Sequence, residues 1–180
     1  ADKAIVVNIT SEEDMLREAR EEKIDGVIHP CSEVSMNVMG RLNEELGLSG
    51  ITREQAIRAT NKHLMREAFE KGNAPSPKSI LTKSAEDACD GILKPSRNSG
   101  SRGIAKVIKT NPNFTNTSKE EFSKLYDIAL NESRDKSVLL EQFIEGPEFS
   151  IEIIVWDGQV NVLTVTDKKT NEAPHFVELG

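Results

Sequence analysis

Lys94 and the loop that follows it have the residue types that suit a polyphosphate ligand. Lys94 ends a short apolar run, and a small cationic loop comes five residues later. Glycines let backbone N–H groups approach phosphate oxygens, and an arginine adds a charge-assisted hydrogen bond. We refer to this loop as the glycine loop; it consists of Ser99, Gly100, Ser101, Arg102 and Gly103. The spacing predicts that Lys94 and the glycine loop bind phosphate groups together.

A second stretch, residues 139–148, has the composition of a nucleoside clamp. Its sequence is Leu-Leu-Glu-Gln-Phe-Ile-Glu-Gly-Pro-Glu. Apolar side chains suit a flat base, and a carboxylate suits the two hydroxyls of a ribose. Each stretch alone has an ordinary alternative, because a Gly/Ser segment is often a plain turn and a strand-end lysine can extend to solvent. Together they predict an ATP site.

Composition excludes several other classes of protein. The 180-residue chain has a formal charge of −7, which argues against a nucleic-acid binder. No apolar run approaches the roughly 18 residues that span a bilayer, and the polar start lacks the apolar core of a secretory signal, so we expect a cytoplasmic protein. Cys31 and Cys89 form no CxxC pair and are expected to be buried free thiols. P-loop, Rossmann-fingerprint and HExxH motifs are absent from the sequence.

Strand and helix patterns alternate in the first fifty residues. Thr10 with Glu13 has the form of a capping box, and Gly47 is a helix stop. This alternation predicts a parallel sheet that belongs to a larger α/β domain. The predicted strands are 4–9 and 25–29, and the predicted helices are 10–22 and 33–46.

Later patterns predict a helical connector and then a small α+β lobe. Thr52 with Gln55 is a second capping box, opening a helical region that ends near Gly72. Ser118 caps another helix, and Asp157-Gly158 is a hairpin turn signal. Residues 110–118 are predicted to be the most mobile loop. The predicted strands are 79–81, 91–94, 104–108, 138–144, 149–156 and 160–166, and the helix covers 118–131.

The order of these motifs resembles the ATP-grasp superfamily along nearly the whole chain. Besides the two stretches above, Asn61-Lys62 through Met65-Arg66 resembles a segment in which the family has aspartate before the lysine. The motifs around Ile92 and His175 are most similar to the group containing the carbamoyl-phosphate synthase large subunit, biotin carboxylase and phosphoribosylamine-glycine ligase. The resemblance implies four parts: the end of the preceding α/β domain (1–60), a connecting helix and linker (61–78), the small ATP lobe (79–137), and the hinge with the first antiparallel strands of the large lobe (138–180).

The resemblance also implies a role for individual residues. Lys62 and Lys94 would contact the α and β phosphates, and the glycine loop would fold over the β and γ phosphates. Glu148 would hydrogen-bond the ribose hydroxyls. Lys168 would reach the γ phosphate, or be a solvated hairpin lysine. The adenine would be held largely by backbone groups of Glu141, Gln142, Phe143 and Ile144.

The same resemblance implies that part of the fold lies outside the chain. Two Mg²⁺ ions in this superfamily are held by acidic and asparagine ligands, which we expect beyond Gly180, and residues 173–180 resemble a segment leading toward them. The start resembles a point after the first strand of the preceding domain. We therefore expect a fragment, or a chain with segments left out.

The implied activity is ATP-dependent ligation of a carboxylate to an amine. It would pass through an acyl phosphate and form ADP and phosphate; the acceptor stays open between bicarbonate, an amino acid and a sugar-derived acid. Two alternatives remain: a module that binds ATP without turnover, and a phosphotransferase acting on an alcohol. The implied partners are ATP, Mg²⁺, a small carboxylate, a small amine and a possible second copy of the chain.

Overall fold

The computed structural model describes residues 3–29, 32–84, 90–108 and 117–169. The chain folds into two compact units, Ala1–Ser76 and Pro77–Gly180. Each unit is described by itself. The boundary between Ser76 and Pro77 lies within residues 61–78, the predicted connecting helix and linker. The finer division into four parts stays a prediction. Cys31, Cys89, residues 110–116 and residues 173–180 lie outside the described residues.

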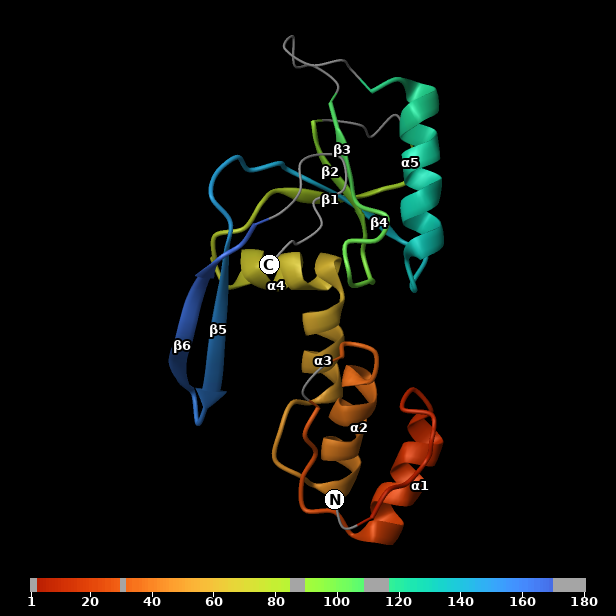
Figure 1. Ribbon diagram of the computed structural model, residues 1–180, viewed down its shortest axis with the longest axis vertical. Helices are drawn as coiled ribbons and strands as arrows, with labels where there is room; N and C mark the ends of the chain where they lie inside the picture. The colour runs from red at the N-terminus through yellow and green to blue at the C-terminus, as the bar shows by residue number, and fades with distance from the viewer. Residues whose placement is uncertain (1–2, 30–31, 85–89, 109–116, 170–180) are drawn as a thin grey trace. The chain divides into compact units, whose positions relative to one another are not determined.

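The described part of the first unit is helical (Figure 1). Its elements are α1 (Glu12–Glu22), α2 (Met36–Leu46), α3 (Arg53–Thr60) and α4 (Lys62–Lys71). The apolar sides of α1 and α2 meet in a small core of Leu16, Ala19, Val38 and Leu42.

The ends of α1 and α2 differ slightly from the prediction. Ser11, and not Thr10, caps α1, because its side chain accepts a hydrogen bond from the Asp14 N–H. The Thr10 hydroxyl instead donates to Asn8 Oδ1 over 2.8 Å, which holds Thr10 in the preceding turn. Helix α2 begins at Met36, three residues later than predicted, and Gly47 ends it in the left-handed conformation as predicted.

The predicted helical region after Thr52 is two helices and not one. The capping box of Thr52 and Gln55 is confirmed, and Gly72 ends α4. Asn61 interrupts the region, because its extended backbone (φ −112°, ψ 113°) ends α3. Its side chain then accepts a hydrogen bond from the Leu64 N–H over 3.0 Å and begins α4.

The two strands predicted in the first unit are wrong. Neither 4–9 nor 25–29 forms a strand, and several of their apolar side chains are exposed to solvent, with Val6 fully exposed and Ile28 92% exposed. A parallel strand is stable only when neighbouring strands satisfy its N–H and C=O groups. No such pairing occurs among the described residues of this unit, so the predicted parallel sheet is not formed there.

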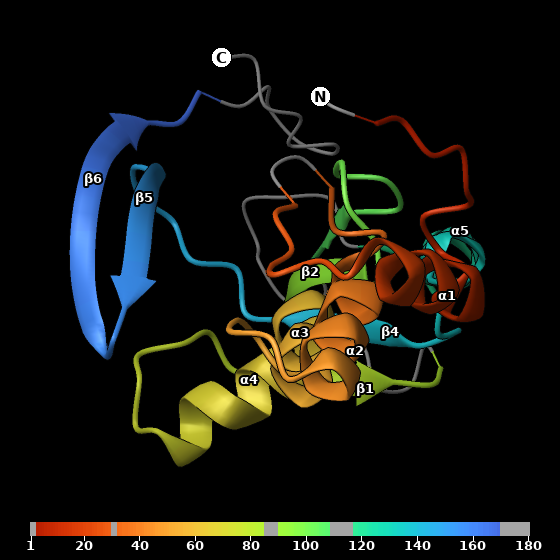
Figure 2. The ribbon, with the colours of Figure 1, turned by 90° about the horizontal axis from the view of Figure 1, so that it is seen from below.

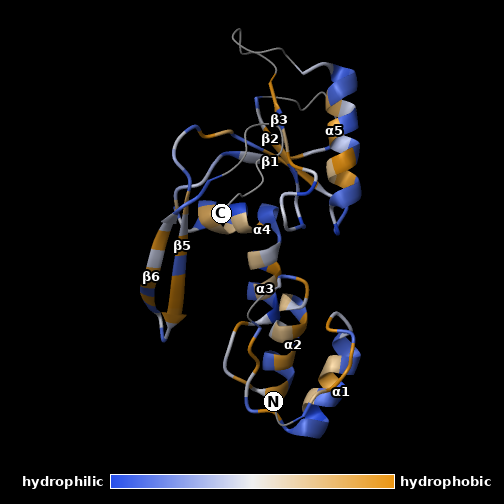
Figure 3. Ribbon diagram, viewed as in Figure 1, coloured by the Kyte–Doolittle hydropathy of each residue, from blue (hydrophilic) through white to orange (hydrophobic). Residues whose placement is uncertain are grey.

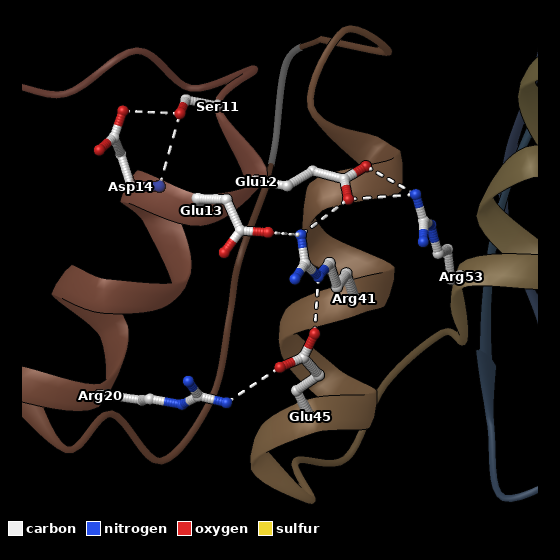
Figure 4. A network of polar contacts seen from close by, with 8 residues as sticks. All are labelled: Ser11, Glu12, Glu13, Asp14, Arg20, Arg41, Glu45 and Arg53. Atoms are coloured by element: carbon white, nitrogen blue, oxygen red, sulfur yellow. Dashed lines mark hydrogen bonds and ion pairs between the residues drawn. The ribbon is translucent and has the colours of Figure 1, made fainter.

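Ion pairs join α1, α2 and α3 (Figure 4). The guanidinium of Arg41 contacts Glu12 at 3.0 Å, Glu13 at 2.8 Å and Glu45 at 2.6 Å. Arg53 at the start of α3 also contacts Glu12, at 3.0 Å. The hydrogen bond and charge of Arg41 lower the pKa of Glu45 below its usual range. The folded unit therefore favours the ionised form of Glu45.

The second unit contains a four-stranded antiparallel sheet with the order β1-β4-β2-β3. The strands are β1 (Ser79–Thr82), β2 (Gly91–Pro95), β3 (Ala105–Val107) and β4 (Val138–Glu141). Helix α5 (Lys119–Glu132), capped by Ser118 as predicted, packs on one face. The core between helix and sheet consists of Leu93, Val107, Phe122, Ala129, Val138 and Leu140.

Strand β4 is shorter than predicted. Its pairing ends at Glu141, which is the last residue in register with both β1 and β2. The chain then leaves the sheet, and we call residues 142–148 the hinge segment. The prediction of a strand to 144 was wrong because apolar character alone does not show where the neighbouring strands end.

Strands β5 (Phe149–Trp156) and β6 (Gln159–Asp167) form the predicted hairpin (Figures 1 and 2). Asp157 and Gly158 both have positive φ (49° and 74°), as a tight hairpin turn requires. Apolar residues line much of both strands, and they are exposed (Figure 3). Among the described residues, no helix has the length and apolar character needed to cross a membrane.

Candidate functional site

The register of the sheet places three charged side chains on the face opposite α5. Lys94 pairs with Leu139, while Ile92 pairs with both Glu141 and Lys106. Directly paired residues of antiparallel strands share a face, and side chains alternate along each strand. Lys94, Lys106 and Glu141 therefore lie on one face, which we call the lysine face.

On the lysine face, the ammonium of Lys94 makes an ion pair with the carboxylate of Glu141. The side chains are 18% and 3% exposed, respectively. Burial strengthens this attraction, because little water screens the two charges. The predicted phosphate ligand thus has a buried counter-charge, and the structure pairs the Glu141 side chain with a lysine within the sheet.

Lys106 and Phe143 meet at the other end of the lysine face. The Lys106 ammonium lies 3.9 Å from the centroid of the Phe143 ring, within the range of a cation–π contact. Both residues, with Gly91 and Gln142, line a cavity of about 400 Å³. This volume is in the range of small-ligand sites. The predicted base-binding residues Gln142 and Phe143 therefore border a cavity, and Ile144 is 62% exposed.

Lys106 was not among the predicted site residues. It alternates with the apolar residues Ala105 and Val107, which is the signal of a half-buried strand. That pattern shows that Lys106 lies opposite Ala105 and Val107. It does not show which neighbouring strand brings Lys106 to the face that carries Lys94.

The glycine loop connects β2 to β3 through a run of left-handed backbone. Gly100, Ser101 and Gly103 have φ values of 74°, 54° and 70°. A Cβ at Gly103 would come within 3.1 Å of Pro95 and of Glu132 in α5. Gly103 therefore allows the loop to pass close to the end of α5, and Lys94 lies one residue before the end of the strand that enters the loop.

Arg102 of the glycine loop is engaged by its own surroundings. Its guanidinium donates to Asn98 Oδ1 over 3.1 Å and lies 3.9 Å from Glu132 Oε2. Asn98 also donates to Glu132, over 3.2 Å, and accepts from the Ser99 N–H. These contacts hold the glycine loop against α5. The predicted contact of Arg102 with phosphate stays a prediction.

Glu148 and Lys168 lie together at the base of the β5–β6 hairpin. Lys168 Nζ is 2.6 Å from Glu148 Oε1, and the Lys168 N–H donates to the Glu148 carbonyl over 2.8 Å. The structure therefore brings these two predicted residues together as a partly exposed ion pair. Their roles at the ribose and the γ phosphate stay predictions.

Lys62 belongs to the first unit, where it is the first residue of α4. The two units are described separately, so the convergence of Lys62 and Lys94 on one ligand stays a prediction. In the described part of the chain, no group of three or more His, Cys, Asp or Glu side chains could hold a metal ion. The Mg²⁺ ligands were expected beyond Gly180, and that expectation stays a prediction.

Comparisons with known proteins give one family and several related structures. A family model described as an ATP-grasp domain matches residues 88–179. The alanine–anticapsin ligase of Bacillus subtilis (strain 168) is 26% identical over 163 residues, which cover 76% of this chain and 34% of that protein. The chain thus spans about a third of the length of this curated relative.

Two solved structures share the fold over most of the chain. The L-amino acid ligase of Bacillus licheniformis has a TM-score of 0.71 and 21% identity, covering 93% of this chain and 38% of that chain. The biotin carboxylase domain of the 2-oxoglutarate carboxylase of Hydrogenobacter thermophilus, in complex with MgADP, ADP and bicarbonate, has a TM-score of 0.69 and 24% identity. That match covers 91% of this chain and 39% of that chain.

Proposed function

Because the chain belongs to the ATP-grasp domain family, we propose that it binds ATP as part of a ligase that joins a carboxylate to an amine. The observation that carries this proposal is the arrangement along the lysine face. The cavity beside Phe143 lies at one end of β2, and Lys94 and the glycine loop lie at the other. The strand spans roughly 13 Å between Gly91 and Pro95 at 3.3 Å per residue, which lets a nucleotide lie along it.

In this arrangement the base would occupy the cavity of Gln142 and Phe143, and the phosphates would extend toward Lys94. Backbone groups of the hinge segment would hydrogen-bond the edge of the base, apart from the Gln142 N–H, which donates to the Lys78 carbonyl over 2.8 Å. The ammonium of Lys94 would stabilise negative charge on the transferring phosphoryl group, with Lys62 as the second cation. The glycine loop would cover the phosphates and keep water from them. Glu148 would bind the ribose hydroxyls and Lys168 the γ phosphate.

The proposed reaction has two steps. A carboxylate oxygen of the acceptor attacks the γ-phosphorus, the bond from that phosphorus to the bridging oxygen breaks, and ADP leaves. The amine nitrogen then attacks the carbonyl carbon of the acyl phosphate, phosphate leaves, and the nitrogen loses a proton to solvent. Mg²⁺ would accompany the nucleotide and supply further positive charge. The described residues support the binding and charge stabilisation and do not identify a general base.

Amino acids are the first substrate class to test. The sequence relative is named for alanine as one reactant, and one structural relative is named an L-amino acid ligase. We propose that an amino acid supplies the carboxylate and another supplies the amine. Bicarbonate and a sugar-derived acid are the remaining classes to compare with them.

The test is release of phosphate from ATP by the intact protein, measured with panels of carboxylates and amines. We expect phosphate release only when both a carboxylate and an amine are present. Hydroxylamine, added in place of the amine, should trap the acyl phosphate as a hydroxamate. ATP binding without phosphate release would support a nucleotide-binding module instead. A stable phosphorylated alcohol would support a phosphotransferase. Either result contradicts the ligase proposal.

A further inference from the structure

The glycine loop is packed at its two ends and open at its tip. Before the loop, the N–H of Arg134, just after α5, donates to the Arg97 carbonyl over 3.0 Å. At the other end, a Cβ at Gly103 would lie 3.2 Å from Ala129 Cα in α5. A Cβ at Gly100 would meet no atom within 4 Å. The end of α5 and the residues after it therefore hold the ends of the loop and leave room around Gly100.

Arg102 is the one charged residue of the glycine loop, and two side chains already hold it. Its Nη2 donates to Asn98 Oδ1 over 3.1 Å, and its Nε lies 3.9 Å from Glu132 Oε2. Asn98 is 7% exposed and donates to the same Glu132 oxygen over 3.2 Å. Glu132 thus holds Arg102 directly and through Asn98, and we call this arrangement the resting contact.

The resting contact is weak enough to be exchanged. The Arg102 and Glu132 side chains are 60% and 40% exposed, so water and salt screen their attraction. A guanidinium that binds two oxygens of a phosphate makes a stronger, bidentate contact. A polyphosphate beside the loop would therefore displace the carboxylate of Glu132 from Arg102.

We propose that Glu132 is a regulatory residue that holds Arg102 against α5 until a nucleotide phosphate takes the place of its carboxylate. This inference rests on the proposed function, since it assumes that the glycine loop binds phosphate. Glu132 acts through Arg102 and touches no ligand. Because the resting contact must break on binding, it lowers nucleotide affinity. The same contact keeps the tip of the loop in place before binding.

A simpler effect of Glu132 has to be separated from this role. Any carboxylate close to a phosphate repels it, whatever Arg102 does. Removal of the charge would then raise affinity both with and without the Arg102 guanidinium. The resting contact requires that the gain depend on Arg102.

The first experiment is calorimetric titration of the intact protein with ADP. Glu132→Gln, which keeps the length of the side chain, should bind ADP about two- to fivefold more tightly, as expected from loss of an exposed ion pair. The same change should have no effect in a protein that already carries Arg102→Gln. Asp127→Asn, which removes an exposed carboxylate elsewhere on α5, is the matched control and should leave the affinity unchanged.

The second experiment tests the resting contact without any nucleotide. Trypsin cleaves after an arginine when the chain around it opens locally, so cleavage after Arg102 reports release of the loop tip. Mass spectrometry should show that Glu132→Gln is cut there about two- to fivefold faster than the unmodified protein. Cleavage after Lys124, an exposed residue of α5, should stay unchanged and shows that the helix remains folded.

Three results would each overturn the inference. Glu132→Gln could bind ADP no more tightly than the unmodified protein, its gain could persist beside Arg102→Gln, or cleavage after Arg102 could be no faster. Each of these results, obtained with a protein that binds ADP, leaves the proposed function standing. If the unmodified protein does not bind ADP, the proposed function and the inference fail together.

Discussion

Lys106 of β3 holds its ammonium 3.9 Å from the centroid of the Phe143 ring, so that a strand at the sheet edge contacts the hinge segment. The contact joins residues 37 positions apart in the sequence (143 − 106). Both side chains border the cavity of about 400 Å³ that we assign to the base. The Lys106 ammonium therefore helps to hold the hinge segment in place beside the sheet.

Replacing Lys106 by methionine should weaken ADP binding about two- to fivefold. A cation–π contact is worth about 0.5 to 1 kcal/mol at sites of this kind, and its loss would leave the Phe143 ring less fixed. Lys106→Arg, which keeps the charge over the ring, should bind nearly as tightly as the unmodified protein. Calorimetric titration of both variants checks this, and equal affinities for Lys106→Met and Lys106→Arg would contradict it.

Lys94→Ala should cost roughly 2 to 4 kcal/mol of nucleotide affinity. The change removes charge-assisted hydrogen bonds to the phosphates and leaves the Glu141 carboxylate buried near them. Lys124→Ala, at an exposed position of α5, removes the same charge from the surface and is the control. Calorimetry with ATP measures both changes. An affinity loss equal to that of the control would show that Lys94 does not bind the phosphates.

Gly103→Ala should destabilise the protein by more than Gly100→Ala. Both glycines have positive φ, which costs a residue with a Cβ about 1 kcal/mol or more. A Cβ at Gly103 would also come within 3.1 Å of Pro95, whereas one at Gly100 meets no atom within 4 Å. Urea unfolding followed by circular dichroism measures the difference. Equal unfolding midpoints would show that the packing against α5 is looser than described.

Asn61→Ala should lower the free energy of unfolding by about 1 kcal/mol, while Asn61→Asp should preserve it. The Asn61 side chain caps α4 through the Leu64 N–H, and an aspartate can accept the same hydrogen bond. A negative charge is also favourable at a helix N-terminus. Thermal unfolding of the two variants tests this, with the aspartate variant serving as the control for the alanine variant. A loss of stability in both variants would count against a capping role.

Acid should weaken the N-terminal cap of α1 and the ion pairs between α1 and α2. The Ser11 hydroxyl and Arg17 lower the pKa of Asp14, and Arg41 lowers that of Glu45. A carboxyl whose pKa is lower in the folded state stabilises the fold above its unfolded pKa, near 4.5 for glutamate. This contribution is lost as the pH falls through the lower, folded value.

The comparison of Glu45→Gln with the unmodified protein isolates that effect. At pH 7 the variant should unfold at a lower urea concentration, because Arg41 has lost an ionised partner. The difference should shrink as the pH falls below 4.5 and through the lowered pKa of Glu45, where the glutamate itself becomes protonated. A difference that stays constant between pH 7 and pH 3 would show that the ion pair does not contribute.

The fold class expected from the motif order, a partial ATP-grasp fold, is confirmed by the family match and the related structures. The sequence by itself determined the features that depend on neighbouring residues. The capping box at Thr52, the cap of Ser118 and the turn at Asp157-Gly158 rest on contacts within a few positions, and a linear pattern contains them.

Only the tertiary structure decided the features that need distant partners. Residues 4–9 and 25–29 have strand composition but form no strand, because a strand depends on neighbours that supply its hydrogen bonds. Lys94, Lys106 and Glu141 share a face because of the register of β2 with β3 and β4. A shift of one residue would place a side chain on the opposite face, and no local pattern fixes that register.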